Sequence, residues 1–283
     1  MLIGKIFGIK FRINIWFLLL AVLYGFLGLG LEILIILTSL ILHELAHLIV
    51  ALIMGVKFLE IELLPFGGQA KLQDFTGLEP SKEICIAIAG PLCSLSISGL
   101  LYLVNLPLHP EAIPYLIKIN LLLGLFNLLP ALPLDGGRVF RSLLSPIMGF
   151  RKATAITANL GKMLALMLVG YSLYLLYISN YGFNYIVIGV LLYMAAYREK
   201  HLLTFAFMRY LINKQGYLGS QGFLAGEQYI SKKGSLIKDI LYNSKPKSYI
   251  LTFVIDDDNN LIKVKTEAEL IEMLLEKGPK ARI

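Results

Sequence analysis

The sequence predicts a mainly α-helical polytopic membrane protein, with six transmembrane helices, a membrane-associated β-hairpin and a small C-terminal α/β domain. Hydrophobic residues make up 57% of the chain and charged residues 16%, which is typical of an integral membrane protein. Six apolar segments are long enough, or nearly so, to cross a bilayer. After about Lys200 the composition becomes mixed and charged, as in a soluble domain. The predicted segments are Ile13–Gly30, Leu31–Gly55, Glu83–Leu106, Ala112–Leu129, Ala153–Ser179 and Phe183–Tyr197.

Lysine and arginine residues are distributed unevenly over the predicted loops. The N-terminus, the loops after the second and fourth segments and the end of the sixth carry them, whereas the junction near Gly30 and the loops Asn105–Glu111 and Asn180–Asn184 carry none. By the positive-inside rule, both termini face the cytoplasm. The net charge of +7 therefore indicates topology and not a nucleic-acid partner. Lys118 and Lys162 fall within predicted segments, where they can snorkel or line a polar interior.

The N-terminal region resembles a secretory signal only in its basic first residues. The apolar run that follows is too long and lacks a convincing cleavage site, so we interpret it as the first membrane-crossing helix. Cys85 and Cys93 both lie in an apolar segment, which favours free thiols over a disulfide.

The second segment contains a histidine–glutamate–x–x–histidine motif at residues 43–47. Ionisable side chains are costly in hydrocarbon, so they usually mark function there. Residues four apart share a helix face, and His43 and His47 can therefore bind one metal ion. Glu44 lies beside them, where it can polarise a metal-bound water. The other two histidines, His109 and His201, lie in a Pro-rich loop and a basic stretch, where we expect surface positions.

The loop Val56–Lys82 contains two strand-like runs on either side of Gly67–Gly68, which predicts a β-hairpin. Open sheet edges are not tolerated in lipid, but a hairpin buried against helices can dip into the membrane. Its exposed edge could pair with an extended peptide. An ordinary cytoplasmic hairpin is the alternative that these residues leave open.

Irregular chain is predicted after the fourth segment, because Pro130 and a second proline cannot continue a helix and the glycine pair after Asp135 allows a tight turn. A catalytic zinc uses three protein ligands and one open position for water. Asp135 is the best-placed third ligand, since the second and fourth segments both run inward and end on the same side. The alternative is that Asp135 caps a helix over Gly137–Leu144.

Together these motifs resemble the site-2 protease family of intramembrane zinc metalloproteases, and within it the sporulation proteases of spore-forming bacteria. The resemblance covers about the first 200 residues. It rests on the histidine motif, on Asn127-x-x-Pro130 leading to Leu134-Asp135-Gly136, and on three further motifs. These are Leu64-Pro65-Phe66-Gly67-Gly68, Ile88-Ala89-Gly90-Pro91-Leu92 and Tyr197-Arg198-Glu199-Lys200-His201. The sequence departs from many members at Cys93-Ser94, where they carry Asn or a similar polar residue.

The resemblance implies one zinc ion per chain, bound by His43, His47 and Asp135, with Glu44 as the general base. It implies a membrane-tethered protein substrate, the pro-form of a late sigma factor in sporulation, cut near the cytoplasmic face. An inhibitory membrane protein is a further implied partner, and the expected location is a bacterial cell membrane. The implied substrate-positioning residues are Asn127, Pro130, Phe66, Gly67 and Gly68.

The C-terminal region predicts a small α/β domain, with strands at Ser248–Ile255 and Leu261–Lys265 joined by a turn at Asp256–Asn260. Helices are predicted at Ser235–Tyr242 and Thr266–Lys277. This order resembles half of a cystathionine-β-synthase (CBS) domain pair, which implies a homo-oligomer and makes ATP a candidate ligand.

The nucleotide-binding pattern of such domains is altered here, because Thr266-Glu-Ala-Glu269 carries Glu in place of the usual Asp. A plain docking or dimerisation module is therefore the alternative for this region. The predicted domain boundaries are 1–200 for the protease domain, 201–225 for a linker and 226–283 for the CBS-like domain.

Two other classes of function fit parts of the sequence. A metal transporter could use the same ligands, but it would need further polar residues along its path, and the first, fifth and sixth segments supply few. A non-catalytic scaffold with a sensory tail would not need Glu44. The sequence therefore predicts an intramembrane zinc metalloendopeptidase.

Overall fold

The computed structural model of the chain describes residues 2–6, 9–13, 28, 30–56, 58–64, 67–72, 79–104, 112–179, 182–199, 211, 222–246, 248–278 and 280–283. The chain divides into two compact units. The first combines Met1–Phe75 with Ser81–Val139, and the second combines Thr76–Pro80 with Phe140–Ile283. The domain boundaries expected near residues 200 and 226 stay a prediction, because most of residues 200–221 lies outside the described part.

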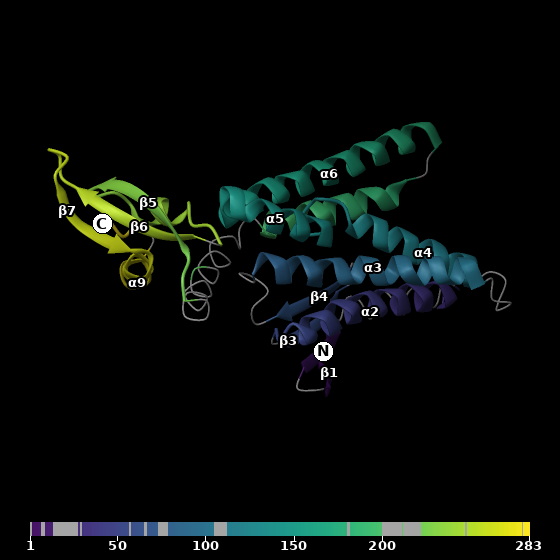
Figure 1. The fold of residues 1–283 in the computed structure, drawn as a ribbon. Coiled ribbons are helices and arrows are strands. Elements are labelled where there is room, and N and C mark those ends of the chain that lie inside the picture. The colour runs from purple at the N-terminus through teal and green to yellow at the C-terminus, as the bar shows by residue number, and fades with distance from the viewer. Residues whose placement is uncertain are drawn as a thin grey trace. The chain divides into compact units, whose positions relative to one another are not determined.

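Three helices make up most of the described part of the first unit: α2 (Gly30–Ile53), α3 (Pro80–Val104) and α4 (Ala112–Asn127) (Figure 1). Helices α2 and α4 are in contact. Polar residues are buried in α2, including Ser39 and both histidines of the motif, whereas apolar side chains such as Ile53, 79% exposed, face outward. This inverted distribution suits helices that are surrounded by lipid.

Among the described residues, the helices α2, α3 and α6 (Phe150–Ser179) are long and apolar enough to cross a membrane. They correspond to the second, third and fifth predicted segments. The fourth segment forms the shorter apolar helix α4, and residues 183–199 of the sixth are helical. Most of the first segment lies outside the described part. The mainly helical class with membrane-length apolar helices is therefore confirmed, and the number of six crossings stays a prediction.

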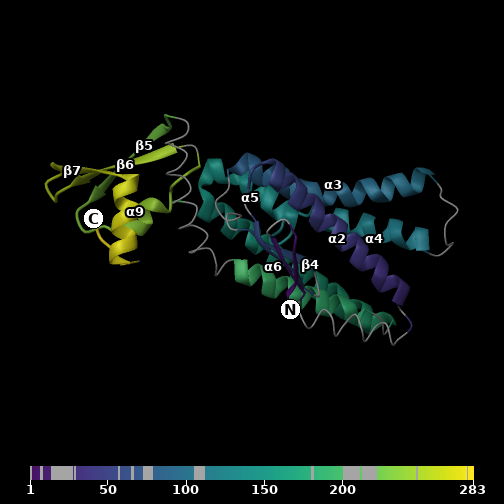
Figure 2. The same ribbon diagram turned by 90° about the horizontal axis from the view of Figure 1, so that it is seen from below.

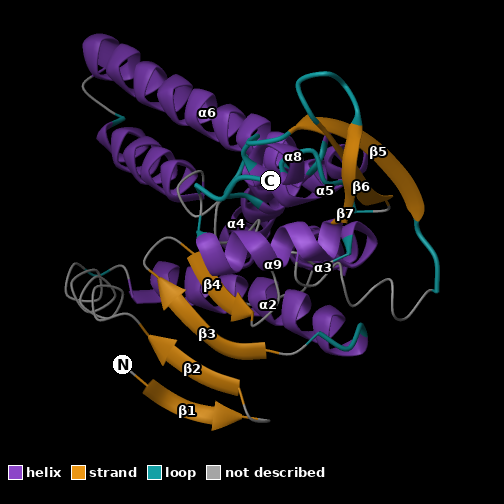
Figure 3. Cartoon of the chain, turned by 90° about the vertical axis from the view of Figure 1, so that its left-hand side faces the viewer, coloured by secondary structure: helices purple, strands orange, loops and turns teal. Residues whose placement is uncertain are grey.

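A four-stranded sheet belongs to the first unit (Figure 3). Its strands β2 and β3 are parallel, and the other neighbours are antiparallel. The predicted hairpin is β3–β4, but the position of its glycines was wrong: Gly67 and Gly68 begin β4, where they pair with Leu64 and Leu63. Strands β1 and β2 were not predicted, because we interpreted the N-terminus as the flank of a membrane segment. The strands, in spatial order, are β1 (Leu2–Ile6), β2 (Ile9–Ile13), β3 (Phe58–Leu64) and β4 (Gly67–Leu72).

The second unit ends in a C-terminal domain, residues 222–283, built on a separate three-stranded sheet (Figure 2). Strands β5 (Ala225–Lys232) and β6 (Ser248–Ile255) are parallel, and β7 (Leu261–Thr266) is antiparallel to β6. Helices α8 (Ile237–Leu241) and α9 (Glu267–Lys277) cover the face of β6 on which alternate residues are buried. The predicted strands and helices are confirmed to within two residues, whereas β5 was not predicted.

A single residue, Gly149, joins α5 (Asp135–Met148) to α6. Gly149 has φ +85°, which glycine adopts without strain. Phe150, 3% exposed, packs into the hydrophobic core of the C-terminal domain. The guanidinium of Arg151 lies 3.4 Å from the centroid of the Tyr242 ring, which favours a cation–π interaction. The first two residues of α6 therefore anchor this helix to the C-terminal domain.

Candidate metal centre

Two histidines face inward from the middle of α2. Every fourth residue of this helix from 35 to 51 is buried, because such residues share a face. His43 is 2% and His47 is 6% exposed. Helix α3 holds the Nδ1 atom of each ring: that of His43 lies 2.9 Å from Ser94 Oγ, and that of His47 lies 2.7 Å from the Ile86 carbonyl oxygen. With Nδ1 held in this way, the Nε2 atoms of both rings turn towards one carboxylate.

Asp135 supplies that carboxylate from the first residue of α5. The chain leaves α4, passes through a turn at residues 128–134 and enters the new helix at Asp135. The two following glycines allow the turn to pack closely. A Cβ atom on Gly136 would lie 2.1 Å from the Leu128 carbonyl oxygen, and one on Gly137 would lie 2.3 Å from the Ala131 carbonyl carbon. Both positions predicted from the sequence as a turn signal therefore require glycine, because a side chain there would collide with the backbone of the preceding turn.

The three side chains converge on one point. Asp135 Oδ2 lies 3.2 Å from Nε2 of His43 and 3.2 Å from Nε2 of His47, and the three ligand atoms all lie within 4.8 Å of one another. Metal–ligand bonds of about 2.0–2.2 Å in a tetrahedral zinc site place ligand atoms about 3.3–3.6 Å apart. The observed separations are close to these values, and two imidazoles with one carboxylate are a donor set of catalytic zinc sites.

The hydrogen bond of His47 shows why a cation fits between these atoms. Its Nδ1 faces a carbonyl oxygen, which can only accept a hydrogen bond, so Nδ1 carries the proton. In the neutral ring, Nε2 is then a lone pair that points at Asp135 Oδ2, a second acceptor. Two buried acceptors 3.2 Å apart repel each other unless a positive charge lies between them. A metal ion bound by both atoms supplies that charge.

Gly90 of α3 leaves the space that an ion needs. A Cβ atom at this position would lie 2.2 Å from His47 Nε2 and 2.7 Å from His43 Nε2. These separations are close to metal–ligand distances and far below carbon–nitrogen contact distances. The residues present therefore fit a zinc ion, with three ligands, two imidazoles held at the other nitrogen, and a glycine where a side chain would fill the site.

Two further charged side chains lie at the centre. Glu44 follows His43 in α2, is half-buried, and interacts electrostatically with both histidines, Asp135 and Arg138. Arg138 lies one turn after Asp135, and its Nη1 is 3.8 Å from Asp135 Oδ1. Asp135 therefore directs one oxygen at the histidines and the other at a cation. A carboxylate such as Glu44 beside a metal centre is suited to accept a proton from water.

The residues expected to position substrate are not among the three converging side chains. Asn127 ends α4, where its amide nitrogen donates to the Leu123 carbonyl of its own helix at 3.0 Å. Pro130 is exposed in the turn that follows. Gly67 and Gly68 begin strand β4, and Phe66 lies outside the described residues. Their roles stay predictions.

Three residues of α3 that the sequence did not single out for a role contact the histidines: Ile86, Gly90 and Ser94. They recur every four residues and so share one helix face. Gly90 belongs to the Ile88-Ala89-Gly90-Pro91-Leu92 motif of the family resemblance, which implied no role for it; the Gly-Pro pair inside an apolar helix is the signal that points to this position. Nothing in the sequence marked the Ile86 carbonyl, because a backbone group carries no residue-type signature.

The model of peptidase family M50 matches residues 31–110 and 110–169 of this chain. A zinc metalloprotease of Methanocaldococcus jannaschii is 36% identical over 211 residues, which cover 70% of this chain and 60% of that protein. Stage IV sporulation protein FB of Bacillus subtilis is 25% identical over 170 residues, or 59% of each protein. The chain thus spans about 60% of the length of these curated relatives.

A solved structure, the site-2 protease from Methanocaldococcus jannaschii, has a similar fold, with a TM-score of 0.59 and 34% sequence identity. The alignment covers 71% of this chain and 94% of that one. The matched family region includes Glu44 and all three converging side chains.

Proposed function

Because the chain belongs to peptidase family M50, the site-2 protease family, we propose that it is an intramembrane zinc metalloendopeptidase. The observation that carries the proposal is the convergence of two imidazole nitrogens and a carboxylate oxygen where a cation is needed. His43, His47 and Asp135 are the proposed ligands. Zinc bound there would lower the pKa of a water molecule to about 7 and polarise the scissile carbonyl.

Glu44 is the proposed general base and acid. Glu44 follows His43 in the sequence, is half-buried and interacts electrostatically with the three ligands. This position suits it to accept the proton of the attacking water and to return it to the leaving amine. Arg138 holds the outer oxygen of Asp135, which leaves Oδ2 directed at the histidines. The chain thus separates three functions: ligation, proton transfer and orientation of the third ligand.

The proposed substrate is a membrane-tethered protein that binds as an extended strand. Strand β4 is at one end of the described sheet and contacts α2, the helix with the histidine motif. An extended peptide can add to such an edge through main-chain hydrogen bonds. The similarity to a sporulation protein supports a pro-sigma factor as the candidate substrate. The proposed positioning residues are Phe66, Gly67, Gly68, Asn127 and Pro130.

For the membrane topology we propose six crossings with both termini in the cytoplasm of a bacterial cell. Among the described residues, three helices of sufficient length and apolarity support this arrangement, as does the uneven distribution of basic residues. An inhibitory membrane protein is a proposed partner that cleavage assays in the native host would reveal.

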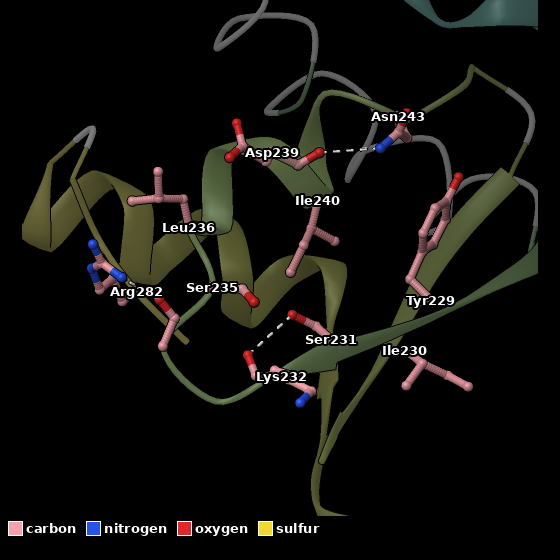
Figure 4. Close-up of a pocket in the computed structure, with 11 residues that line it drawn as sticks. Tyr229, Ile230, Ser231, Lys232, Ser235, Leu236, Asp239, Ile240, Asn243 and Arg282 are labelled. Atoms are coloured by element: carbon pink, nitrogen blue, oxygen red, sulfur yellow. Dashed lines mark hydrogen bonds between the residues drawn. The ribbon is translucent and has the colours of Figure 1, made fainter. Parts of the chain in front are cut away.

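For the C-terminal domain we propose a CBS-like regulatory or dimerisation role, with ATP as a candidate ligand. The element order β5-α8-β6-β7-α9 supports the likeness. A hollow of about 560 Å³ lies beside α8 and the end of β5, with Lys232 and Arg282 in its lining (Figure 4). Its volume is in the range of small-molecule sites. Isothermal titration of the whole chain with ATP, compared with Lys232→Ala, tests this assignment.

The test of the proteolytic function is co-expression with a tethered pro-sigma factor. We expect the wild-type chain to shorten the substrate on a gel, and Glu44→Gln to leave it full-length while elemental analysis still finds zinc. A Glu44→Gln chain that cleaves would remove Glu44 from its role. A wild-type chain that leaves the substrate intact but carries zinc into vesicles would replace the protease with a transporter.

A further inference from the structure

One face of α3 is built against the two histidines of α2. Its residues Ile86, Gly90, Ser94 and Ser98 recur every four positions, and all of them are buried. The Ile86 carbonyl oxygen and the Ser94 hydroxyl lie at hydrogen-bonding distance from the Nδ1 atoms of the two rings. Gly90 lies against both rings, where a Cβ atom would leave no room. The fourth donates to the Ile117 carbonyl at 3.1 Å and does not touch a histidine.

The two imidazoles differ in how their tautomer is fixed. The carbonyl oxygen of Ile86 can only accept, so it places the proton of His47 on Nδ1 without ambiguity. The Ser94 hydroxyl at His43 Nδ1 can accept or donate. Both orientations satisfy a hydrogen bond, but only an accepting hydroxyl leaves the Nε2 lone pair of His43 free to face Asp135 and a metal.

We propose that Ser94 is a positioning residue that holds His43 in its metal-binding tautomer and orientation. The proposal rests on the proposed zinc site and names a residue that acts on it through His43. The Ser94 hydroxyl oxygen accepts a hydrogen bond from the Nδ1–H group of His43. This bond keeps the ring fixed and directs Nε2 at the point shared with His47 and Asp135. Groups that orient metal-bound histidines in this way set ligand basicity and ring orientation.

A purely structural role for Ser94 is a distinct alternative, because a serine can join two helices in a membrane without any link to a metal. Ser98 is the internal comparison for that role. It lies one turn further along the same face and is 5% exposed, and its hydroxyl joins α3 to α4. Replacing Ser98 removes a helix–helix hydrogen bond, whereas replacing Ser94 removes the hydrogen bond of a metal ligand.

The experiment measures metal binding by the whole chain in detergent. Zinc affinity is obtained by competition with a chromogenic chelator, and the visible absorption of the cobalt(II) form reports the geometry of the ligands. We expect Ser94→Ala to weaken zinc binding about 10–100-fold and to change the cobalt spectrum. The matched control, Ser98→Ala, should match the wild type in both measurements.

A second pair of variants removes the effect of packing. Ser94→Thr and Ser94→Val have nearly the same shape and differ in the hydroxyl group, so Ser94→Thr should bind zinc more tightly than Ser94→Val. This comparison holds even if Ser94→Ala folds poorly. Equal affinities of the Thr and Val variants, or of Ser94→Ala and wild type, would overturn the role of Ser94 and leave the protease proposal standing. A wild-type chain that binds no zinc would overturn both.

Discussion

Two carboxylates in this chain occupy the same local position and have opposite surroundings. Asp135 is the first residue of α5 and Glu267 is the first residue of α9, and both are buried, at 7% and 1% exposure. Glu267 accepts hydrogen bonds from the Ser244 hydroxyl at 2.5 Å and from the Ile250 backbone N–H at 3.0 Å. Its partners are proton donors supplied by the protein.

Asp135 instead faces two imidazole nitrogens, at least one of which has no proton to give when its ring is neutral. Burying a charge is costly unless it is paired and hydrogen-bonded. Glu267 meets that condition within the fold, whereas Asp135 pairs only its outer oxygen with Arg138, and its Oδ2 atom, between neutral imidazoles, meets the condition when a cation is bound. Burial alone does not distinguish a structural carboxylate from a functional one. The distinction lies in whether the groups around the carboxylate can donate hydrogen bonds to it.

The largest expected effect is the loss of zinc from Asp135→Ala. The substitution removes one of three ligands, so we expect zinc in the purified chain and cleavage of a tethered substrate both to fall below detection. Elemental analysis and the co-expression gel measure the two quantities. Glu267→Gln is the matched control and should keep full zinc content. Zinc retained by Asp135→Ala would show that this carboxylate only begins the helix, as Glu267 begins α9, and does not bind the metal.

A similarly large effect is expected from a single methyl group at Gly90. The Cβ of Gly90→Ala would lie 2.2 Å from His47 Nε2, so the ring must move or the ion must be lost, and zinc affinity should fall by at least about 100-fold. Gly99→Ala on the same helix is the control, because a Cβ there meets nothing within 4 Å. Equal zinc affinity in the two variants, measured by chelator competition, would remove Gly90 from the site.

The residues that the sequence identified around this centre are those whose role follows from local spacing. His43 and His47 share a helix face because they are four apart, and Asp135 follows a proline-broken segment. Ser94 and Ile86 could not be assigned in this way. Their contacts cross 51 and 39 residues of sequence, so they depend on how α3 packs against α2, which periodicity does not encode.

The same division applies to the strands. Strands β6 and β7 were predicted because their residues are apolar or β-branched and a turn sequence joins them. Strand β5 contains Ala, Gly, Glu and Gln, and it pairs in parallel with β6 along its whole length. Strand β2 likewise pairs in parallel with β3, far along the chain. Parallel pairing joins distant segments, and no local signal announces it.

A smaller effect, confined to stability, is expected at the structural carboxylate. Glu267→Ala leaves two buried donors without this acceptor, at a cost of about 1–3 kcal/mol each. We expect the C-terminal domain to unfold at a lower temperature while zinc content is unchanged. Scanning calorimetry of the whole chain in detergent, together with hydrogen exchange of the β6 peptide, measures the change. Loss of zinc from this variant would mean that the two carboxylates are not independent.

The smallest expected effect is a pH dependence at Glu227 in β5. Partial burial alone would raise the pKa of this carboxyl, but Lys245, with Nζ at 2.9 Å, and the Tyr229 hydroxyl at 3.2 Å hold the pKa below its ordinary value of 4.5. Because the pKa is lower in the folded chain, the unfolded chain binds the proton at a higher pH than the folded chain does. The stabilisation of the folded domain is therefore complete above about pH 4.5 and is lost as the pH falls through the lowered pKa.

Glu227→Gln removes this dependence, so its calorimetric transition should lie below that of the wild type near neutral pH and approach it in acid. The relevant transition is the one that Glu267→Ala lowers, since both residues belong to the C-terminal domain. Glu276→Gln, an exposed change on α9, should follow the wild type at every pH. A wild-type-to-Glu227→Gln difference that stays constant from neutral to acid pH would show that the partners of Glu227 do not favour its charged form. Glu227 would then differ from both Asp135 and Glu267, because its hydrogen bonds would contribute packing and no preference for the charged carboxylate.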